Sequence, residues 1–468
     1  MEQHDFGIVG LGVMGRNLLL NMADHGFSVA GLDLDTEKAA FLESEASAEQ
    51  HVFGTTSAAD FVKSLKKNRA IMLLVPAGKA VDAAISSLLN YLEEGDIVID
   101  GGNSYFADTD RRVAELAAKN IHFFGMGISG GEKGARFGPS MMPGGDRQAY
   151  ERLRPVFEAI AADVNGEPCV SFLGNGSAGN YVKMVHNGIE YAIMELIAES
   201  YDFMKRGLKY PDGKIQTTFE AWNHSELQSF LLEITAEVLK KKDELTGLRL
   251  INVISDRARS KGTGKWTSQN AMDLQIPVPV IDAAVIMRDL SARKEERIQA
   301  SSRLIWTNST SPVSSEEADI VLKEAFQFAM VSVYAQGFAQ LRAASTTYGY
   351  ELKLEDVARI WRGGCIIRAA CLEDFRAAFR RDSSLSNLML DDEIGGMLVD
   401  TQAGLRTLIK MAVDSGVPVP AYMASLGYFD AYRSPDLPTN LIQAQRDYFG
   451  AHLYERTDQE GLFHTQWG

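Results

Sequence analysis

A glycine-rich turn lies close to the N-terminus, between a short apolar segment and an amphipathic one. Its residues are Gly10, Leu11, Gly12, Val13, Met14 and Gly15, the pattern Gly-x-Gly-x-x-Gly. The preceding segment Phe6–Val9 is predicted to be a strand, and Met14, Leu18 and Met22 recur at helical spacing. This order of strand, turn and helix predicts a βαβ unit that binds the pyrophosphate of a dinucleotide at the helix N-terminus. A glycine-rich turn without a ligand is the alternative, and the flanking strand and helix argue against it.

Apolar segments alternate with amphipathic helical segments as far as Gly176. The predicted strands are Phe6–Val9, Ser28–Leu32, Ile71–Val75, Ile97–Asp100, Ile121–Phe124 and Val170–Leu173. Short apolar strands separated by helices predict a parallel sheet that is covered by helices on both faces. After Gly176 the pattern becomes helical, with long stretches at 180–206, 225–243 and 317–346.

This pattern predicts three parts of the chain. We expect an α/β Rossmann-type dinucleotide-binding domain over residues 1–177 and a large all-helical domain over residues 178–434. Residues 435–468 contain Pro435 and Pro438 near their start and are predicted to be a C-terminal tail that packs on a partner chain.

Composition excludes several classes of protein. Hydrophobic residues make up 46% of the chain and charged residues 23%, which excludes a disordered chain or a coiled coil. The apolar run Ala70–Val75 is far shorter than the ~20 residues that span a bilayer, and Met1–Asp5 lacks the basic region of a signal peptide. The cysteines Cys169, Cys365 and Cys371 form no Cys-x-x-Cys pair. We therefore expect no metal site, no membrane partner and a cytoplasmic location.

The charge balance is acidic. Lys and Arg number 47, Asp and Glu number 62, and the formal net charge is −15. This charge argues against nucleic acid as a partner. An anionic substrate would need a local cluster of Lys and Arg to overcome the field of the whole chain.

The end of the second predicted strand, Asp33-Leu34-Asp35, indicates which dinucleotide binds. Asp33 lies 18 residues after Gly15, close to the ~20 expected for the acid that binds the adenosine ribose. A carboxylate about 4 Å from a 2′-phosphate costs about 1 kcal/mol in water and about 4 kcal/mol near a protein surface. We therefore predict NAD over NADP, with Lys38 as a partial offset. Asp35 is alternatively only the N-cap of the next helix.

The segment Asn180–Tyr191 places several polar side chains on one face of a predicted helix. At 100° per residue, Lys183, His186, Asn187 and Glu190 lie within about 100° of one another. Lys183 and Glu190 are about 10.5 Å apart along the axis, so a base and an acid can reach opposite ends of a small substrate. A solvated helix face with a Lys/Glu pair is the alternative. The Asn, the His and the position just after a nucleotide-binding domain favour a catalytic helix.

Together with later segments, this helix resembles the 6-phosphogluconate dehydrogenase family over nearly the whole chain. The matching segments are 101–104, 128–132, 138–145, 183–191, 261–267, 361–368 and 443–452. The resemblance implies a Rossmann-type domain, a helical domain and a homodimer in which each tail enters the other subunit. It also implies oxidative decarboxylation of 6-phosphogluconate to ribulose 5-phosphate and CO2 with NAD or NADP, in the pentose phosphate pathway and without a metal.

The resemblance also implies a role for individual residues. Lys183 is the expected general base for the C3 hydroxyl and later polarises the ketone, and Glu190 is the expected general acid that protonates C1. Residues expected to contact the sugar acid are Asn103, Ser129, Gly130, Gly131, His186 and Asn187. Residues expected to contact the phosphate are Tyr191, Lys261, Thr263 and Arg288, with Arg446 and His452 from the partner subunit. Residues expected to contact the cofactor, besides the glycine motif, are Asp33, Leu34, Asp35, Val75, Pro76, Ala77 and Asn103.

The expected substrate is strongly anionic, because a phosphorylated sugar acid carries about three negative charges near neutral pH. Lys261, Arg288 and Arg446 are the local cations that the acidic chain requires. Taken singly, each has an ordinary alternative: Lys261 in a glycine-rich turn, Arg288 and Arg446 beside an aspartate on a helix surface.

A few positions depart from the family pattern. Many members have Asn-Arg-Thr in place of Asp33-Leu34-Asp35 and a lysine in place of Pro76, so this chain lacks cations that could bind a 2′-phosphate. Asn180 replaces a common histidine, and Lys133 replaces a common glutamate. One alternative function is another β-hydroxyacid dehydrogenase, such as a 3-hydroxyisobutyrate-type enzyme, whose shorter chains lack the second helical region. The other is a non-catalytic NAD-binding sensor, which would need no acid/base helix.

Overall fold

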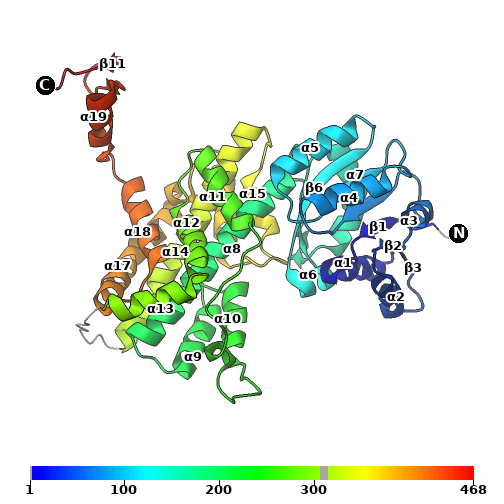
Figure 1. Ribbon diagram of the computed structural model, residues 1–468, viewed down its shortest axis with the longest axis horizontal. Helices are drawn as coiled ribbons and strands as arrows, with labels where there is room; N and C mark the ends of the chain where they lie inside the picture. Colours follow the sequence, from blue (N-terminus) through cyan, green and yellow to red (C-terminus); the bar gives the residue numbers. More distant parts are fainter. Residues whose placement is uncertain (1–2, 306–314) are drawn as a thin grey trace.

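The structure is a computed structural model that describes residues 3–305 and 315–468. An α/β part carries the N-terminus, a helical part adjoins it, and a short tail projects from the helical part (Figure 1). This arrangement confirms the predicted order of a Rossmann-type domain, a helical domain and a C-terminal tail.

The sheet of the α/β part has the strand order β3-β2-β1-β4-β5-β6-β7. The strands are β1 (Phe6–Val9), β2 (Val29–Leu32), β3 (Val52–Thr55), β4 (Ala70–Leu73), β5 (Ile97–Asp100), β6 (His122–Ser129) and β7 (Ser140–Gly144). All neighbours are parallel except β6 and β7, which are antiparallel. The order reverses between β1 and β4, and a crevice at the carboxyl ends of the strands is expected at such a point.

Helices lie on both faces of this sheet. They are α1 (Val13–Asp24), α2 (Thr36–Glu45), α3 (Ala58–Ser64), α4 (Lys79–Leu88), α5 (Phe106–Ala117), α6 (Gly131–Phe137) and α7 (Arg147–Ile160). Side chains of the central strands alternate between two apolar layers: Ile97 and Ile99 enter one layer and Val98 the other. Because both layers are apolar, the strands read as continuous hydrophobic runs in the sequence.

Three strand assignments from the sequence require correction. The strands β3 and β7 were not predicted, and Val170–Leu173 is not a strand. This segment runs beside β7 with one isolated bridge, Met141 to Val170, and the N–H of Leu173 donates to the carbonyl of Pro143. Pro143 has no N–H to donate in return, so a continuous ladder does not form. A hairpin of β8 (Asp163–Val164) and β9 (Glu167–Pro168) precedes this segment.

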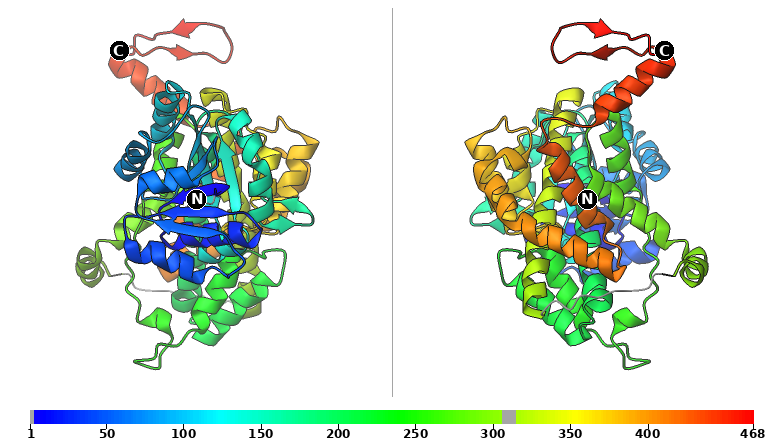
Figure 2. Two further views of the ribbon diagram at one scale, coloured as in Figure 1. Left: turned by 90° about the vertical axis from the view of Figure 1, so that its right-hand side faces the viewer. Right: turned by 90° about the vertical axis from the view of Figure 1, so that its left-hand side faces the viewer.

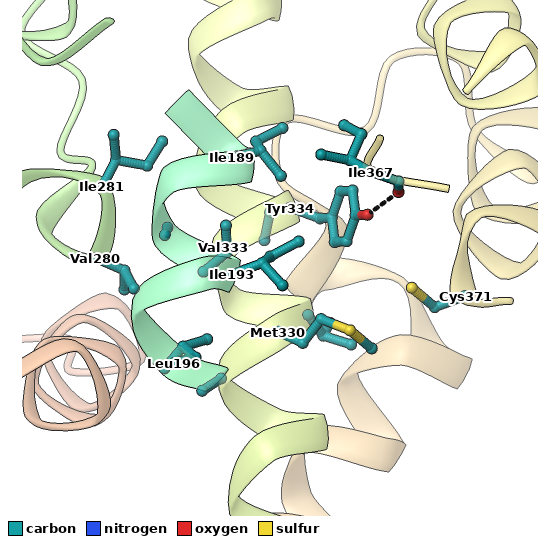
Figure 3. Packing of buried hydrophobic residues seen from close by; sticks show 14 of the residues in the cluster. Ile189, Ile193, Leu196, Val280, Ile281, Met330, Val333, Tyr334, Ile367 and Cys371 are labelled. Carbon is teal, nitrogen blue, oxygen red and sulfur yellow. Dashed lines mark hydrogen bonds between the residues drawn. The ribbon is translucent and has the colours of Figure 1, made fainter. Parts of the chain in front are cut away.

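The helical part is built around two long helices that pack on each other, α8 (Ala178–Asp202) and α14 (Ser315–Tyr348). The shorter helices are α9 (Asp212–Asn223), α10 (Phe230–Lys240), α11 (Thr263–Asp273), α12 (Pro279–Ser291), α13 (Lys294–Arg303), α15 (Leu354–Ile360), α16 (Cys371–Arg381), α17 (Asp392–Ser415) and α18 (Pro420–Tyr432). Single turns of other helix types occur at Phe203–Gly207, Leu250–Asn252 and Leu388–Leu390. Figure 3 shows Ile193 of α8 beside Val333 and Tyr334 of α14, inside the largest apolar cluster.

The tail consists of α19 (Thr439–Gly450) and a small hairpin of β10 (Tyr454–Glu455) and β11 (Leu462–Phe463). It projects from the rest of the chain beyond α18 (Figure 2). The buried carboxylate of Asp447 holds the tail together, since it accepts bonds from His464, Thr465 and Trp467. Among the described residues, no helix has both the length and the apolar character that crossing a bilayer requires.

Candidate active site

The glycine turn after β1 has the geometry of a dinucleotide-binding loop. Gly10 has φ of +97°, and a Cβ there would lie 2.5 Å from the carbonyl oxygen of Leu74. A Cβ on Gly15 would lie 1.9 Å from the carbonyl oxygen of Gly10, so α1 packs directly on the turn. A Cβ on Gly12 would meet nothing within 4 Å. The first and third glycines therefore shape the turn, and the second faces open space into which a pyrophosphate fits.

The N-terminus of α1 is free to bind an anion. Its N-cap is Gly12, which forms no side-chain capping bond, and the first turn contains no acidic residue. The unpaired N–H groups and the helix dipole therefore favour negative charge at this point.

Asp33 connects the end of β2 to the glycine turn. Its Oδ2 accepts a bond from the N–H of Leu11 at 2.7 Å, and its Oδ1 accepts one from the N–H of Asp35 at 3.0 Å. Each oxygen retains a further lone pair for a ribose hydroxyl. Asp35 accepts from the N–H of Glu37 at 2.9 Å, so the alternative prediction for Asp35, the N-cap of α2, is observed. Lys38 Nζ lies 3.7 Å from Asp33 and 3.8 Å from Asp35.

A second cation near this end, Arg16, follows the glycine motif directly. Its Nε lies 2.8 Å from Glu45 Oε2, and its guanidinium lies 4.6 Å from the ring centroid of Phe41. Leu34, between the two aspartates, is 97% exposed. Arg16 and Lys38 therefore each lie beside a carboxylate.

The loops after β4 and β5 follow the carboxyl ends of strands next to the glycine turn. Val75 lies beside the glycine turn, since its Cγ1 would be 3.0 Å from a Cβ on Gly10. Pro76 and Ala77 are exposed at the same edge, and Asn103 is exposed after β5. The structure thus places these predicted cofactor-binding residues at the carboxyl ends of adjacent strands.

Helix α8 begins directly against the sheet. A Cβ on Gly127 of β6 would lie 2.3 Å from the Cβ of Lys183, and one on Gly125 would lie 1.8 Å from Oδ1 of Asn180. The glycines of β6 therefore allow the first turns of α8 to approach the backbone of the strand closely. As a result Lys183 is 5% exposed, at the junction of the α/β part and the helical part.

A buried polar network surrounds Lys183. Its Nζ lies 3.4 Å from Nδ1 of His186, which is also 2.9 Å from Oδ1 of Asn187. Nε2 of His186 lies 3.0 Å from Oγ of Ser129 and 3.0 Å from Sγ of Cys365. Lys183, His186, Asn187 and Ser129, which the sequence analysis predicted as a site, are therefore brought together by the fold.

Burial shifts the pKa values of the proposed base and acid in opposite directions. It lowers the pKa of Lys183, although the negative charge of Glu190 opposes the shift. It raises the pKa of Glu190, although Lys183 and Arg288 oppose the shift. Burial, followed by the charge of Lys183, holds the pKa of His186 well below its usual value. The lysine is thereby suited to accept a proton and the glutamic acid to donate one.

The loop after β6 forms another wall of the site. Ser129 ends β6, Gly130 is the N-cap of α6 and Gly131 is its first residue. Oγ of Ser129 accepts a bond from the N–H of Ile366 at 3.1 Å, which joins this wall to the segment before α16. Cys365, in that segment, contacts His186, and sequence analysis did not identify it because a lone cysteine has no diagnostic spacing.

A cationic end of the site lies one to two turns further along α8. The guanidinium of Arg288 lies 3.4 Å from the ring centroid of Tyr191. A Cβ on Gly264 would lie 2.4 Å from the same ring, so α11 packs on Tyr191. Thr263 is buried at the first position of α11, and Lys261 is exposed just before it. Of the four residues predicted to contact the phosphate, Tyr191, Thr263 and Arg288 lie on the helices α8, α11 and α12. Lys261 lies on the loop before α11.

Glu195, also on α8, was not predicted. Burial raises its pKa to about 7, and the charge of Arg288 opposes the shift. The sequence predicts that Glu195 lies one turn beyond Tyr191 on the same helix, but it does not predict that Glu195 is buried.

Arg446 is in α19 and His452 follows this helix, so both belong to the tail. The tail projects away from the rest of the chain and from this site (Figure 1). Nη1 of Arg446 donates to Oε1 of Gln443, and His452 packs edge-on against Phe449. In residues 3–305 and 315–468, no group of three or more His, Cys, Asp or Glu side chains is arranged to hold a metal ion.

Comparisons with known proteins match both parts of the chain. Residues 5–174 match the model of the NAD binding domain of 6-phosphogluconate dehydrogenase, and residues 179–467 match its C-terminal domain. A decarboxylating NADP(+)-dependent 6-phosphogluconate dehydrogenase of Bacillus subtilis is 50% identical over 100% of both chains. A decarboxylating enzyme of Lactococcus lactis subsp. lactis is 49% identical over 100% of this chain and 99% of its own. Among solved structures, a Plasmodium falciparum 6-phosphogluconate dehydrogenase, studied with NADP+ and with 6-phosphogluconate, superposes with a TM-score of 0.96. It is 43% identical, over 99% of this chain and 100% of its own.

Proposed function

The chain belongs to the 6-phosphogluconate dehydrogenase family, and we propose that it oxidatively decarboxylates 6-phosphogluconate to ribulose 5-phosphate and CO2. NAD+ or NADP+ is reduced in this reaction. The observation that carries the proposal is the pair Lys183 and Glu190 on one face of α8, with pKa values displaced in opposite directions. The names of the full-length relatives support the same reaction.

In the proposed mechanism the neutral amine of Lys183 takes the proton of the C3 hydroxyl. The bound nicotinamide supplies the hydride acceptor. The resulting 3-keto acid loses CO2 while the ammonium of Lys183 polarises the ketone and gives its proton to the ketone oxygen, which forms the enediol. Lys183 takes this proton back when C1 is protonated. Glu190, whose pKa is raised by burial, then donates its proton to C1 of the enediol. The protons balance, because one side chain gains the proton that leaves the hydroxyl and the other supplies the proton that reaches carbon.

We assign the remaining contacts by their place in this site. Asn103, Ser129, Gly130, Gly131, His186 and Asn187 hold the sugar acid, and Tyr191, Lys261, Thr263 and Arg288 hold the phosphate. His186 is neutral at physiological pH because its pKa is well below the usual value, so it takes part in hydrogen bonding and not in charge neutralisation. The stacked guanidinium of Arg288 is presented in a fixed orientation, which suits bidentate binding of phosphate oxygens.

We propose that NAD is the preferred cofactor. Lys38 lies beside Asp33 and Asp35, and Arg16 is paired with Glu45, so carboxylates compete with a 2′-phosphate for both cations. Asp33 itself would face such a phosphate with a negative charge. The Bacillus subtilis relative is named as NADP(+)-dependent. We assign the proposed NAD preference of this chain to its own residues 33–35.

We further propose a homodimer with domains at 1–177 and 178–434 and a tail at 435–468 that supplies Arg446 and His452 to the partner's site. The exposed tail, whose α19 buries only Asp447, supports this arrangement. The free cysteines support a reducing, cytoplasmic location.

A substrate panel tests the proposal. Reduction of NAD+ is followed by absorbance with 6-phosphogluconate, with unphosphorylated gluconate and with 3-hydroxyisobutyrate. We expect rapid reduction with 6-phosphogluconate alone. Faster reduction with 3-hydroxyisobutyrate would favour another β-hydroxyacid dehydrogenase, and binding of NAD without any reduction would favour a sensor.

A further inference from the structure

Asn180 connects three elements at the start of the catalytic helix. It lies one turn before Lys183 on α8 and is 2% exposed. Its Oδ1 accepts a bond from Oγ1 of Thr109 on α5 at 2.9 Å, and its Nδ2 donates to the carbonyl of Gly102 at 3.2 Å. The approach of this side chain to β6 requires Gly125, since a Cβ there would lie 1.8 Å from Oδ1.

The chemistry of these two contacts fixes the orientation of the amide. The carbonyl of Gly102 can only accept a hydrogen bond, so it must face the NH2 group of Asn180. A flipped amide would place two acceptor oxygens against each other in a buried site. The position therefore needs a side chain that presents one donor toward Gly102 and one acceptor toward Thr109.

The carbonyl of Gly102 belongs to the peptide that leads into Asn103. The rest of this loop is held from the sheet: the N–H of Gly101 donates to the carbonyl of Leu73, and the N–H of Gly102 donates to Asp100. Asn103 itself is exposed. Rotation of the peptide between Gly102 and Asn103 would turn Asn103 without breaking the contacts to the sheet, and the bond from Asn180 opposes that rotation.

We propose that Asn180 is a positioning residue, which orients Asn103 relative to Lys183 by holding the carbonyl of Gly102. The inference rests on the proposed function, in which Asn103 contacts both the sugar acid and the cofactor. Asn180 and Lys183 lie on the same helix. The bond from Asn180 to Gly102 therefore fixes the position of the Gly102–Asn103 loop relative to Lys183. The amide thus acts on the alignment of C3 with the nicotinamide, and not on proton transfer itself.

Two substitutions separate this role from general support of the fold. Asn180→Ala removes both hydrogen bonds, whereas Thr109→Val removes the hydroxyl of Thr109 and leaves the bond to Gly102. We expect kcat to fall about 10- to 100-fold in Asn180→Ala and to stay within about twofold of the wild type in Thr109→Val. The deuterium isotope effect measured with 6-phosphogluconate deuterated at C3 should increase in Asn180→Ala alone, because hydride transfer becomes slower than the other steps.

A conservative variant provides a rescue. The neutral imidazole of Asn180→His also presents one donor and one acceptor, so we expect its kcat and isotope effect to return to within about threefold of the wild type. Asn180→Leu, of similar size and without hydrogen bonds, should behave as Asn180→Ala does and replaces it if the alanine variant does not fold. Equal loss of kcat in the Thr109 and Asn180 variants, or a loss with an unchanged isotope effect, would overturn the proposal.

Amide hydrogen exchange of residues 101–105 tests the same contact without turnover. Exchange in this loop should be at least about tenfold faster in Asn180→Ala and unchanged in Thr109→Val. Unchanged exchange in both variants overturns the role of Asn180 even if the wild type is active. If instead the wild type does not oxidise 6-phosphogluconate, the proposed function fails, and the exchange rates still decide whether Asn180 holds the loop.

Discussion

Burial is the common cause of the pKa shifts at Lys183 and Glu190, and it acts oppositely on an amine and a carboxylic acid. The sequence placed both residues on one helix face by their spacing. It did not show their burial. The burial of Lys183 depends on the glycines of β6 that let α8 approach the sheet. Cys365 joins the site only through contacts between distant segments, so no local pattern identified it.

Lys183→Met should lower kcat about 100- to 10,000-fold or more, since the variant has no base for the C3 hydroxyl. Binding of NAD, measured by fluorescence titration, should stay within about twofold of the wild type because Lys183 lies outside the glycine turn. Lys67→Met, at an exposed lysine of the α/β part, is the matched control and should keep full activity. Substantial turnover by Lys183→Met would remove this residue as the base.

Asp33→Asn combined with Leu34→Arg should shift the ratio of kcat/KM for NAD over NADP by at least about tenfold toward NADP. The change removes one repulsive charge and adds one attractive charge near a 2′-phosphate, each contributing about 1 kcal/mol. The amide oxygen that Asp33→Asn introduces can still accept from the N–H of Leu11, so the glycine turn should persist. Leu245→Arg, at a leucine that is 95% exposed elsewhere, controls for added charge. An unchanged ratio would contradict our account of residues 33–35.

At the scale of elements, the sequence predicts the strands that consist of a continuous apolar run, but it does not predict β3 and β7. The strand β7 has the sequence Ser-Met-Met-Pro-Gly, which resembles a turn, and β3 is only partly buried at the sheet edge. The prediction of a strand at Val170–Leu173 is wrong. Its neighbour β7 contains Pro143, which has no N–H to donate to this segment. Apolar content alone does not show whether a neighbouring segment can complete a ladder.

Gly127→Ala should destabilise the junction of α8 and β6 by about 1–3 kcal/mol, since the added methyl group would overlap the Cβ of Lys183. Thermal unfolding should show a lower midpoint, and kcat should fall because Lys183 is displaced. Gly427→Ala, at an exposed helical position where a Cβ meets nothing within 4 Å, is the control and should be neutral or stabilising. Equal midpoints for the two variants would argue against close packing at Gly127.

An ion-pair cluster ties the β8–β9 hairpin to the helical part. Glu167 accepts hydrogen bonds from Arg376 and Arg362. The bonds from Arg376 have the largest effect, and together with Arg362 they lower the pKa of Glu167 to about 2, although burial opposes the shift. Because the folded-state pKa is below the unfolded one, the contribution of Glu167 to stability is present above about pH 4.5 and lost as pH falls toward 2.

We therefore predict that the stability difference between the wild type and Glu167→Gln, measured by urea unfolding, is greatest near neutral pH. The difference should shrink as pH falls through this window, because protonation then removes the charge from the wild type as well. Glu158→Gln, at a glutamate on the surface of α7 whose salt bridge with Arg154 is 3.8 Å long, is the control and should show little effect at any pH. A difference that stays constant from pH 7 to pH 3 would be inconsistent with this role.

At the scale of the whole molecule, the tail does not reach the site of its own chain. Its helix α19 exposes large apolar side chains, among them Leu441, Ile442, Tyr448 and Phe449. An exposed apolar face of this kind marks an interaction surface, which fits the proposed exchange of tails between subunits.

Subunit mixing tests the exchange. Homodimers of Lys183→Met or of Arg446→Ala should each be weakly active. In heterodimers one site combines an intact Lys183 with an intact Arg446 from the other chain, so random mixing should restore about a quarter of wild-type activity. Arg456→Ala, at an arginine of the tail that pairs with Asp458, should remain active as a control. A mixture no more active than the separate homodimers would show that Arg446 is not supplied in trans.

The most direct test of the account measures reduced nicotinamide and released CO2 together, with 6-phosphogluconate as substrate and NAD+ and NADP+ in parallel. We predict equal amounts of the two products and a higher kcat/KM with NAD+. Reduction without CO2, or no reduction with either cofactor in folded protein, would contradict the proposed reaction. Equal products with faster use of NADP+ would retain the reaction and contradict the cofactor preference alone.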